Sequence, residues 1–196
     1  MNRPLILSLA LLATSLNAAA QTAATTVQRD VNQQTRIEQG LKSGELSTRE
    51  AARLEREQSA ISRQQSRALA DGKLTPAEQA RLTASQNKAS RDIRAAKTNN
   101  VTGDPQSASS QRLQADVQRN INQSQRIEAG VQNGSLTNRE VAKLERGQAR
   151  VEGKEARAGR DGHVGAAEQA RIQRTENRQS RRIHHEKHDA QVRNPS

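Results

Sequence analysis

The sequence of 196 residues contains no cysteine, phenylalanine, tryptophan or tyrosine. The absence of cysteine excludes a disulfide framework and any site that binds a metal through thiolates. The absence of aromatic rings excludes a platform on which nucleic-acid bases or sugars could stack. Leucine, isoleucine and valine are scarce, with 25 of them in residues 21–196. This small apolar content excludes a deep, dry pocket and is also typical of disordered chains, which is the alternative to a folded protein.

Positive charge is in excess, with 32 Lys and Arg against 21 Asp and Glu and a formal net charge of +11. A cluster of arginines near the C-terminus favours contact with phosphate groups or with an acidic protein. The alternative is a solubilising surface, because acidic residues three or four positions away pair with many basic residues. Without aromatic rings, any contact with nucleic acid would be electrostatic and unspecific. The candidate polyanion site comprises Arg174, Arg178, Arg181 and Arg182.

The N-terminus has the features of a secretory signal peptide in residues 1–20. A short positive start is followed by an apolar run at residues 5–13 and by three alanines that end at Ala20. We therefore expect cleavage near Ala20 and a periplasmic mature chain, with an uncleaved anchor as the alternative. No later stretch reaches the roughly 18 apolar residues that a transmembrane helix needs, so we expect no membrane span in the mature chain.

The chain contains a tandem duplication with an offset of 90 residues. Residues 27–99 align without gaps with residues 117–189, and 32 of the 73 aligned positions are identical. A polar linker with glycine and proline, residues 98–111, separates the two copies. We call residues 21–97 unit 1 and residues 112–190 unit 2, and we expect a flexible tail at residues 191–196.

Helix starts recur in both units after a glycine, which permits the left-handed turn that closes the preceding helix. A hydroxyl residue three positions after the glycine can cap the first helical N–H groups, and a glutamate three positions further completes a capping box. The fourth such start is weaker, because Gly165 replaces the hydroxyl residue. The predicted capping pairs are Ser47 with Glu50, Thr75 with Glu78, and Thr137 with Glu140.

These starts predict an all-α fold with three helices in each unit. Because a unit supplies only about ten aliphatic side chains, worth about 2 kcal/mol each when buried, we expect thin helix seams or packing against a partner. Gly147 and Gly153 fall inside the middle helix of unit 2, which we expect to be looser than its counterpart. The predicted helices span residues 24–42, 48–70, 76–97, 112–132, 138–158 and 166–190. The two predicted seams are Ala51, Leu54, Gln58 and Ile61, and Leu82, Gln86, Ala89 and Ile93.

Three histidines, His184, His185 and His188, form a candidate metal site in the last predicted helix. His184 and His188 are four residues apart and share a helical face, and neutral imidazoles at that spacing bind zinc, copper or nickel. Unit 1 has Arg94 and Thr98 at the equivalent positions, so the two units do not share this feature. A solvated helix end is the alternative, and apart from a weakly bound divalent metal we expect no cofactor.

The glycine turns resemble the second half of an EF-hand calcium loop. In residues 71–78, Gly72, Leu74 and Glu78 stand where such a loop has its glycine, aliphatic residue and final glutamate. The first half differs, because Arg67 and Leu69 replace residues that would supply oxygen ligands. Degenerate calcium binding is therefore a second alternative.

The motif Gly-x-Leu-Ser/Thr-x-x-Glu at residues 44–50 and 72–78 resembles that of small exported proteobacterial helical repeat proteins with no assigned activity. The ending Lys187-His188-Asp189 is similar to the usual ending of that group. The resemblance covers nearly all of both units, and it implies a Gram-negative periplasmic setting and a helical fold but no chemistry. A looser similarity links the chain to the LTxxQ family of periplasmic chaperones and metal-stress sensors, although Gln79 comes one position late.

The sequence contains no set of nucleophile, base and acid and no glycine-rich phosphate loop after a strand, so we expect no enzymatic activity. We expect a non-enzymatic protein that contacts its partners through its surface, in a chaperone-like or envelope-stress role. The expected partners are anionic envelope components or unfolded proteins. The oligomeric state, and whether the two units touch, stay open at this point.

Overall fold

The computed structural model describes residues 13–189, and that range contains six α-helices and no strand, which confirms the all-α prediction. Residues 1–12 of the predicted signal peptide and the predicted tail lie outside the described residues. No helix in the described range is long and apolar enough to cross a membrane. The helices are α1 (Ala13–Ser43), α2 (Thr48–Ala68), α3 (Pro76–Lys97), α4 (Ala108–Gln132), α5 (Asn138–Ala158) and α6 (Ala166–Lys187), and a short 3-10 helix, η1 (Gly159–Asp161), follows α5.

The predicted capping boxes begin α2, α3 and α5. At α2, the Ser47 hydroxyl accepts from the Glu50 N–H at 3.3 Å, and the Glu50 carboxylate accepts from the Ser47 N–H at 3.0 Å. At α6 only the second half of the box exists, where the Gly165 N–H donates to Glu168 Oε2 at 2.9 Å. These local hydrogen bonds fix the first residue of all four helices at the predicted position.

The linker between the units is shorter than predicted and packs against unit 1. The Ser107 hydroxyl caps α4, so residues 108–111 belong to that helix. The Gly103 N–H donates to the Gly44 carbonyl at 2.8 Å, and a Cβ on Gly103 would lie 2.3 Å from the Leu46 carbonyl oxygen. The linker therefore follows the turn between α1 and α2 closely.

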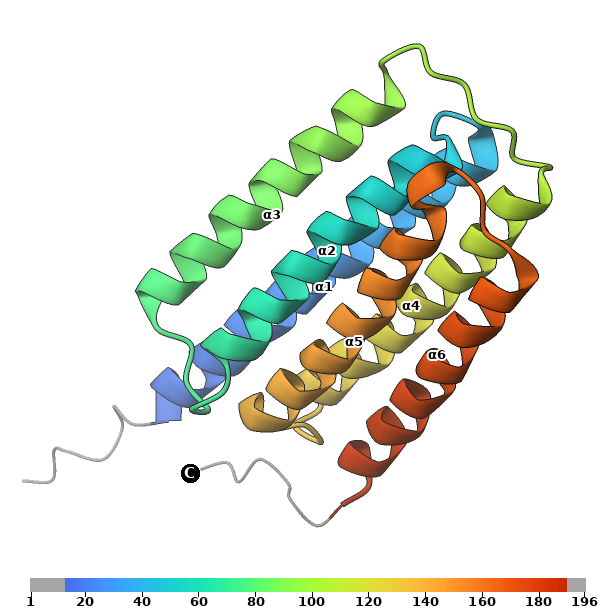
Figure 1. Cartoon of the computed structure of the whole chain (residues 1–196). Coiled ribbons are helices and arrows are strands. Elements are labelled where there is room, and N and C mark those ends of the chain that lie inside the picture. Colours follow the sequence, from blue (N-terminus) through green and yellow to red (C-terminus); the bar gives the residue numbers. More distant parts are fainter. Residues whose placement is uncertain (1–12, 190–196) are drawn as a thin grey trace, which may run out of the picture.

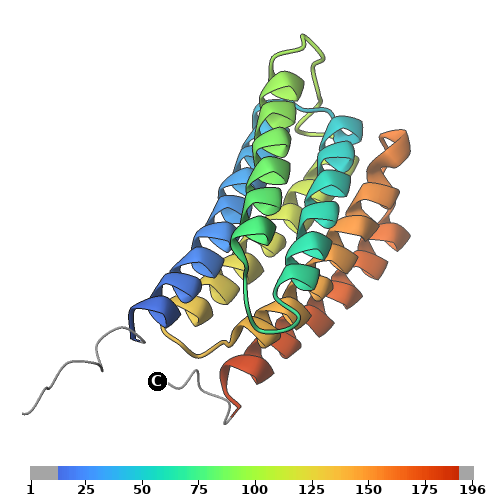
Figure 2. The same cartoon turned by 90° about the vertical axis from the view of Figure 1, so that its left-hand side faces the viewer.

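The two units pack against each other, and equivalent helices form the largest contacts. α2 packs on α5 and α1 packs on α4, while α3 and α6 flank this central layer on opposite sides (Figures 1 and 2). The contacts are reciprocal, because Arg49 Nη2 donates to the Asp161 carbonyl at 2.9 Å and Arg139 Nη2 donates to the Asp71 carbonyl at 3.2 Å. Each unit is thus the partner that the other one needs, and an approximate two-fold axis relates them.

The interior consists of two apolar clusters with a polar layer between them along α2 and α5. One cluster includes Leu41, Leu54 and Ile121, and the other includes Leu69, Ile127 and Leu144, so each contains residues of both units. Every residue of the two predicted seams is buried, including the glutamines. The Gln86 amide, for example, donates to the Thr26 carbonyl at 2.9 Å, which explains how a glutamine is tolerated in a seam.

Candidate functional site

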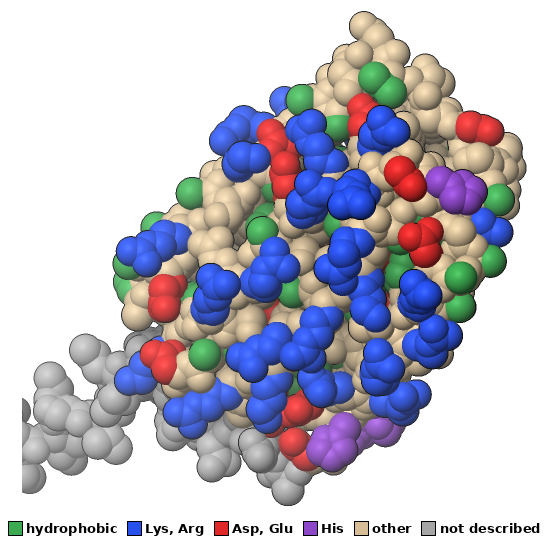
Figure 3. All heavy atoms as spheres, viewed as in Figure 1, with side chains coloured by type: hydrophobic (Ala, Val, Ile, Leu, Met, Phe, Trp, Pro, Cys, Tyr) green, Lys and Arg blue, Asp and Glu red, His purple; other side chains and the backbone are tan. Residues whose placement is uncertain are grey.

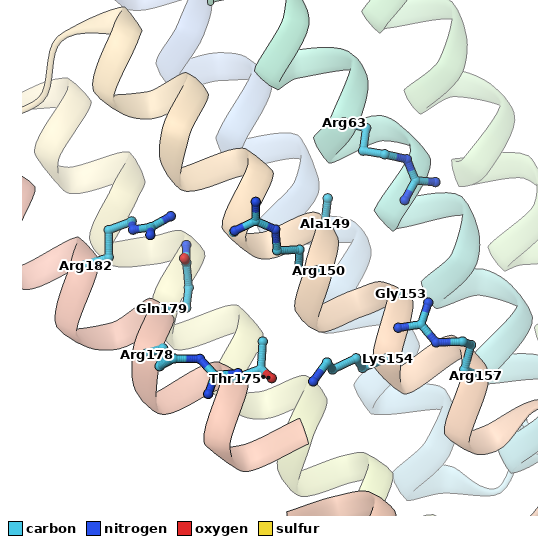
Figure 4. A pocket seen from close by; sticks show the side chains of 11 residues that line it. Arg63, Ala149, Arg150, Gly153, Lys154, Arg157, Thr175, Arg178, Gln179 and Arg182 are labelled. Carbon is cyan, nitrogen blue, oxygen red and sulfur yellow. Dashed lines mark hydrogen bonds between the residues drawn. The ribbon is translucent and has the colours of Figure 1, made fainter. Parts of the chain in front are cut away.

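A hollow with a volume of about 380 Å³ lies between α5 and α6 and extends to α2. Lys and Arg side chains gather over these helices on the face seen in Figure 3. Arg63 comes from α2, a row of cations from α5, and two arginines from α6 (Figure 4). We call this hollow the cationic groove. Its charged lining consists of Arg63, Arg150, Lys154, Arg157, Arg178 and Arg182, with no acidic residue among the lining side chains.

Glycines in α5 shape the groove. Gly147 and Gly153 both line it, and neither interrupts the helix. A Cβ on Gly147 would lie 1.8 Å from Gln179 Oε1, and a Cβ on Gly153 would lie 3.2 Å from the Ser59 hydroxyl. The missing side chains therefore let α6 and α2 come close to α5, a packing role that the sequence did not indicate.

The positive charge of the groove is not neutralised by the protein. None of its six cations forms an ion pair with an acidic residue within the described range. Partial burial, followed by the nearby positive charges of Arg178 and Arg157, lowers the pKa of Lys154 below its usual value. An anion in the groove would relieve this repulsion and would meet planar guanidinium groups that suit phosphate oxygens.

Unit 1 contains the equivalent hollow between α2 and α3, and there the charges are balanced. Lys88, which lines it, forms ion pairs with Asp92 and, at 3.6 Å, with Glu57. The difference follows from a few substitutions between aligned positions. Glu57, Ala60, Gln64 and Asp92 of unit 1 correspond to Gly147, Arg150, Lys154 and Arg182 of unit 2.

The four predicted arginines do not act as one set. Arg178 and Arg182 line the groove, whereas Arg174 stands beside it and contributes to the repulsion of Lys154. Arg181 is exposed and does not line the groove. The sequence analysis missed Arg63, Arg150, Lys154 and Arg157. The signal that could have found Arg150 and Lys154 is the change from neutral to basic residues between the aligned units.

The buried face of α5 carries acidic residues that the sequence analysis also missed. Glu145, Glu152 and Glu155 are at most 4% exposed. Burial raises the pKa of all three well above the usual value, and nearby carboxylates, including Glu55 beside Glu152 and Glu155, add to this effect. Because burial disfavours the ionised form of these carboxyls, α5 carries basic residues on its outer face and carboxyls with raised pKa values on its inner face.

One buried layer differs strongly between the units. In unit 1, the amides of Gln65 and Gln86 both donate to the Asp30 carboxylate, whose pKa burial raises to about 7. In unit 2 the aligned residues are Asn120, Glu155 and Glu176, and the Asn120 amide donates to both Glu155 oxygens at 2.9 and 2.7 Å. At these three aligned positions, unit 1 thus has one carboxylate and two amides, whereas unit 2 has one amide and two carboxylates.

Asp116 and Glu176 of unit 2 are both fully buried. The Asp116 carboxylate interacts with Gln169, and the Glu176 carboxylate pairs with Arg119. Burial raises the pKa of Asp116 to about 7 and that of Glu176 to about 8. The Arg119 Nε lies 3.0 Å from Glu176 Oε2 and lowers the pKa of both carboxyls in part. The aligned residues of unit 1, Thr26 and Gln86, carry no charge.

The predicted histidine site lies at the C-terminal end of α6, away from the groove residues. The rings of His184 and His188 stack with centroids 4.3 Å apart, and His188 Nδ1 lies 2.7 Å from the His184 carbonyl oxygen. All three histidines, including His185, are exposed. They do not form a group of three converging ligand atoms within the described residues.

The carboxylates of the EF-hand-like turns accept hydrogen bonds from backbone N–H groups of the same turns. Asp71 Oδ1 accepts from the Lys73 N–H at 2.9 Å, and Glu78 Oε2 accepts from the Thr75 N–H at 2.9 Å. In unit 2, Asp161 Oδ1 accepts from the His163 N–H in the same way. These hydrogen bonds account for the turn residues without a calcium ion.

Comparison of the chain with protein-family models, with curated proteins and with solved structures finds no match.

Proposed function

We propose that the protein is a non-enzymatic, exported binding protein that holds phosphate-bearing anionic components of the envelope in the cationic groove. The observation that supports this proposal most directly is the set of six unpaired cations around one hollow, in a chain whose other unit balances the equivalent charges. The signal-peptide features of residues 1–20 support export.

The shape and chemistry of the groove favour phosphate groups. Its volume of about 380 Å³ is an order of magnitude above the share of about 30 Å³ that one water molecule occupies, so it has room for a headgroup. Guanidinium groups form paired hydrogen bonds with phosphate oxygens, and five of the six cations are arginines. Several such contacts together would bind an anion with more than one phosphate group.

An electrostatic mode of binding is better supported than an apolar one. Val101 is the one large hydrophobic residue exposed within the described range, at 48% of its surface. A chaperone that holds unfolded clients through apolar contacts needs a larger apolar surface. If the protein has a chaperone-like role, its clients are therefore expected to be anionic or to bind in the cationic groove.

Vesicle binding tests the proposal. The purified chain should cosediment with vesicles of phosphatidylglycerol and phosphatidylcholine at low salt, but not with phosphatidylcholine alone, and inorganic polyphosphate should displace it. The double variant Arg150→Ala/Lys154→Gln, which installs the unit 1 residues, should bind at least about tenfold more weakly, since 1.4 kcal/mol corresponds to a factor of ten.

The matched control is Arg91→Gln/Arg94→Gln on α3, which removes the same charge from exposed positions at the opposite edge of the bundle (Figure 1). It should weaken binding less than about twofold, because α3 does not line the groove and salt screens charges that lie away from the bound anion. Equal losses of vesicle binding in both variants would mean that binding depends on the net charge of the protein and not on the position of the cations. The groove proposal would then be wrong.

A further inference from the structure

Three carboxylates meet where the start of α5 lies beside the end of α6. Glu140 belongs to the first turn of α5, Glu186 to the last turn of α6, and Asp189 follows that helix. One oxygen from each lies within 4.8 Å of the other two. Glu140 is 1% exposed, while Glu186 and Asp189 are half-buried.

The buried Glu140 carboxylate is only half satisfied. Its Oε2 accepts from the Thr137 N–H and hydroxyl, both at 2.7 Å, and completes the capping box. Its Oε1 is buried without a hydrogen-bond partner. A buried carboxylate oxygen that has no donor costs free energy unless a cation is close to it.

Unit 1 shows how the same corner is satisfied without a cation. There the Asn99 amide donates to Glu50 Oε1 at 2.6 Å. The alignment places Asp189 at the position of Asn99 and Glu186 at the position of Ala96. Unit 2 has thus lost the amide that paired with this oxygen and gained two carboxylates around it.

Lys143 Nζ lies 3.3 Å from Glu186 Oε2 at this corner. Ligands that are all carboxylate oxygens suit hard divalent cations, and calcium, with oxygen ligands at about 2.3–2.6 Å, fits oxygens that are up to about 4.8 Å apart. We propose that Glu140, Glu186 and Asp189 bind a calcium ion that joins the start of α5 to the end of α6.

This site is distinct from the histidine site and from the EF-hand-like turns, because it uses none of their side chains. It lies at one end of the two helices that form the cationic groove. A bound ion would hold these ends together and would restrict opening of α6 away from α5.

Calcium titration of the purified full chain, followed by calorimetry and by thermal unfolding, tests the proposal. Calcium chloride should give saturable binding and should raise the melting temperature of the wild type. The variant Glu186→Ala/Asp189→Asn installs the unit 1 residues, and it should lose at least about tenfold in calcium affinity and show no calcium-dependent rise.

The same variant should unfold at a higher temperature than the wild type in the presence of a chelator, because the carboxylate repulsion is removed and the amide at position 189 can donate to Glu140. This result would show that loss of binding is not loss of folding. The triple variant His184→Ala/His185→Ala/His188→Ala should keep the calcium response. The proposal is overturned if the wild type shows no response, if the unit 1 residues leave the response unchanged, or if the histidine variant abolishes it.

Discussion

Unit 1 and unit 2 have three corresponding α-helices each, yet they distribute charge in opposite ways. In unit 1 the surface between α2 and α3 is balanced, because Lys88 pairs with Asp92 and Glu57. In unit 2 the charged residues that line the cationic groove between α5 and α6 are all basic, and the buried residues of the unit include carboxyls such as Asp116 and Glu176. The fold therefore depends on what the two units share, and the candidate sites depend on where unit 2 departs from unit 1.

The largest expected effect comes from replacing Asp116 and Glu176 of unit 2 by the uncharged residues that unit 1 has at the aligned positions. The variant Asp116→Thr/Glu176→Gln should raise the free energy of unfolding at pH 9 by about 2–4 kcal/mol, because the wild type must bury ionised carboxyls there. Urea denaturation measures this quantity.

The pH dependence of the wild type provides the control for this variant. The folded pKa values, about 7 and about 8, lie above the ordinary values of 3.8 and 4.5. The stabilisation from these protonated carboxyls is therefore complete below about pH 4 and is lost as the pH rises through 7 to 8. The variant should show a smaller decline between pH 5 and pH 9, and an unchanged slope would contradict the assignment of the decline to these two residues.

A smaller effect is expected where unit 2 has Gly159 and unit 1 has Leu69. A Cβ on Gly159 would lie 2.7 Å from the Ala52 Cβ and 3.3 Å from the Thr48 carbonyl oxygen. Because neither neighbour can turn away, Gly159→Ala should lower the free energy of unfolding by about 1–3 kcal/mol. Gly153→Ala is the control, since its Cβ meets only the Ser59 hydroxyl at 3.2 Å and the helix gains about 1 kcal/mol of propensity. A larger loss in the control than in Gly159→Ala would contradict this account of the packing.

The smallest expected effect is a gain of function in unit 1. The variant Ala60→Arg/Gln64→Lys copies two groove cations onto the balanced surface, where Lys88 stays paired with its acidic neighbours. Binding to anionic vesicles should rise only about threefold, which corresponds to about 0.7 kcal/mol. The variant Thr102→Lys/Gln106→Lys adds the same charge to the exposed linker and should have a weaker effect. If the linker variant binds equally well, the position of the charge is unimportant.

Local signals predicted the helices well. Ser47, Thr75 and Thr137 begin their helices through hydrogen bonds to residues three positions away, so the sequence contains the whole interaction. The starts of α1 and α4 were predicted less well. The helix α1 begins at Ala13 and not at residue 24. The helix α4 begins at Ala108 and not at residue 112, because Ser107 caps it without a glutamate three residues later.

The packing of the units and the groove could not be predicted in the same way. The contact between α2 and α5 uses polar residues, such as the Ser59 hydroxyl that donates to the Ala149 carbonyl at 2.8 Å, and no apolar stripe marks it. The groove combines Arg63 of α2 with residues of α5 and α6 that are more than 80 positions away. Arg178 and Arg182 were found because they are neighbours in one helix, whereas Arg63 becomes part of the site only through tertiary packing.

The reciprocal pairs Arg49 with Asp161 and Arg139 with Asp71 have an evolutionary consequence. Contacts of this kind are those of a two-fold homodimer, in which one surface patch meets its own copy. Fusion of two such subunits through the linker makes the pairing independent of concentration. It also releases each half from the requirement that both partners be identical, so that one half could preserve the scaffold while the other acquired new chemistry.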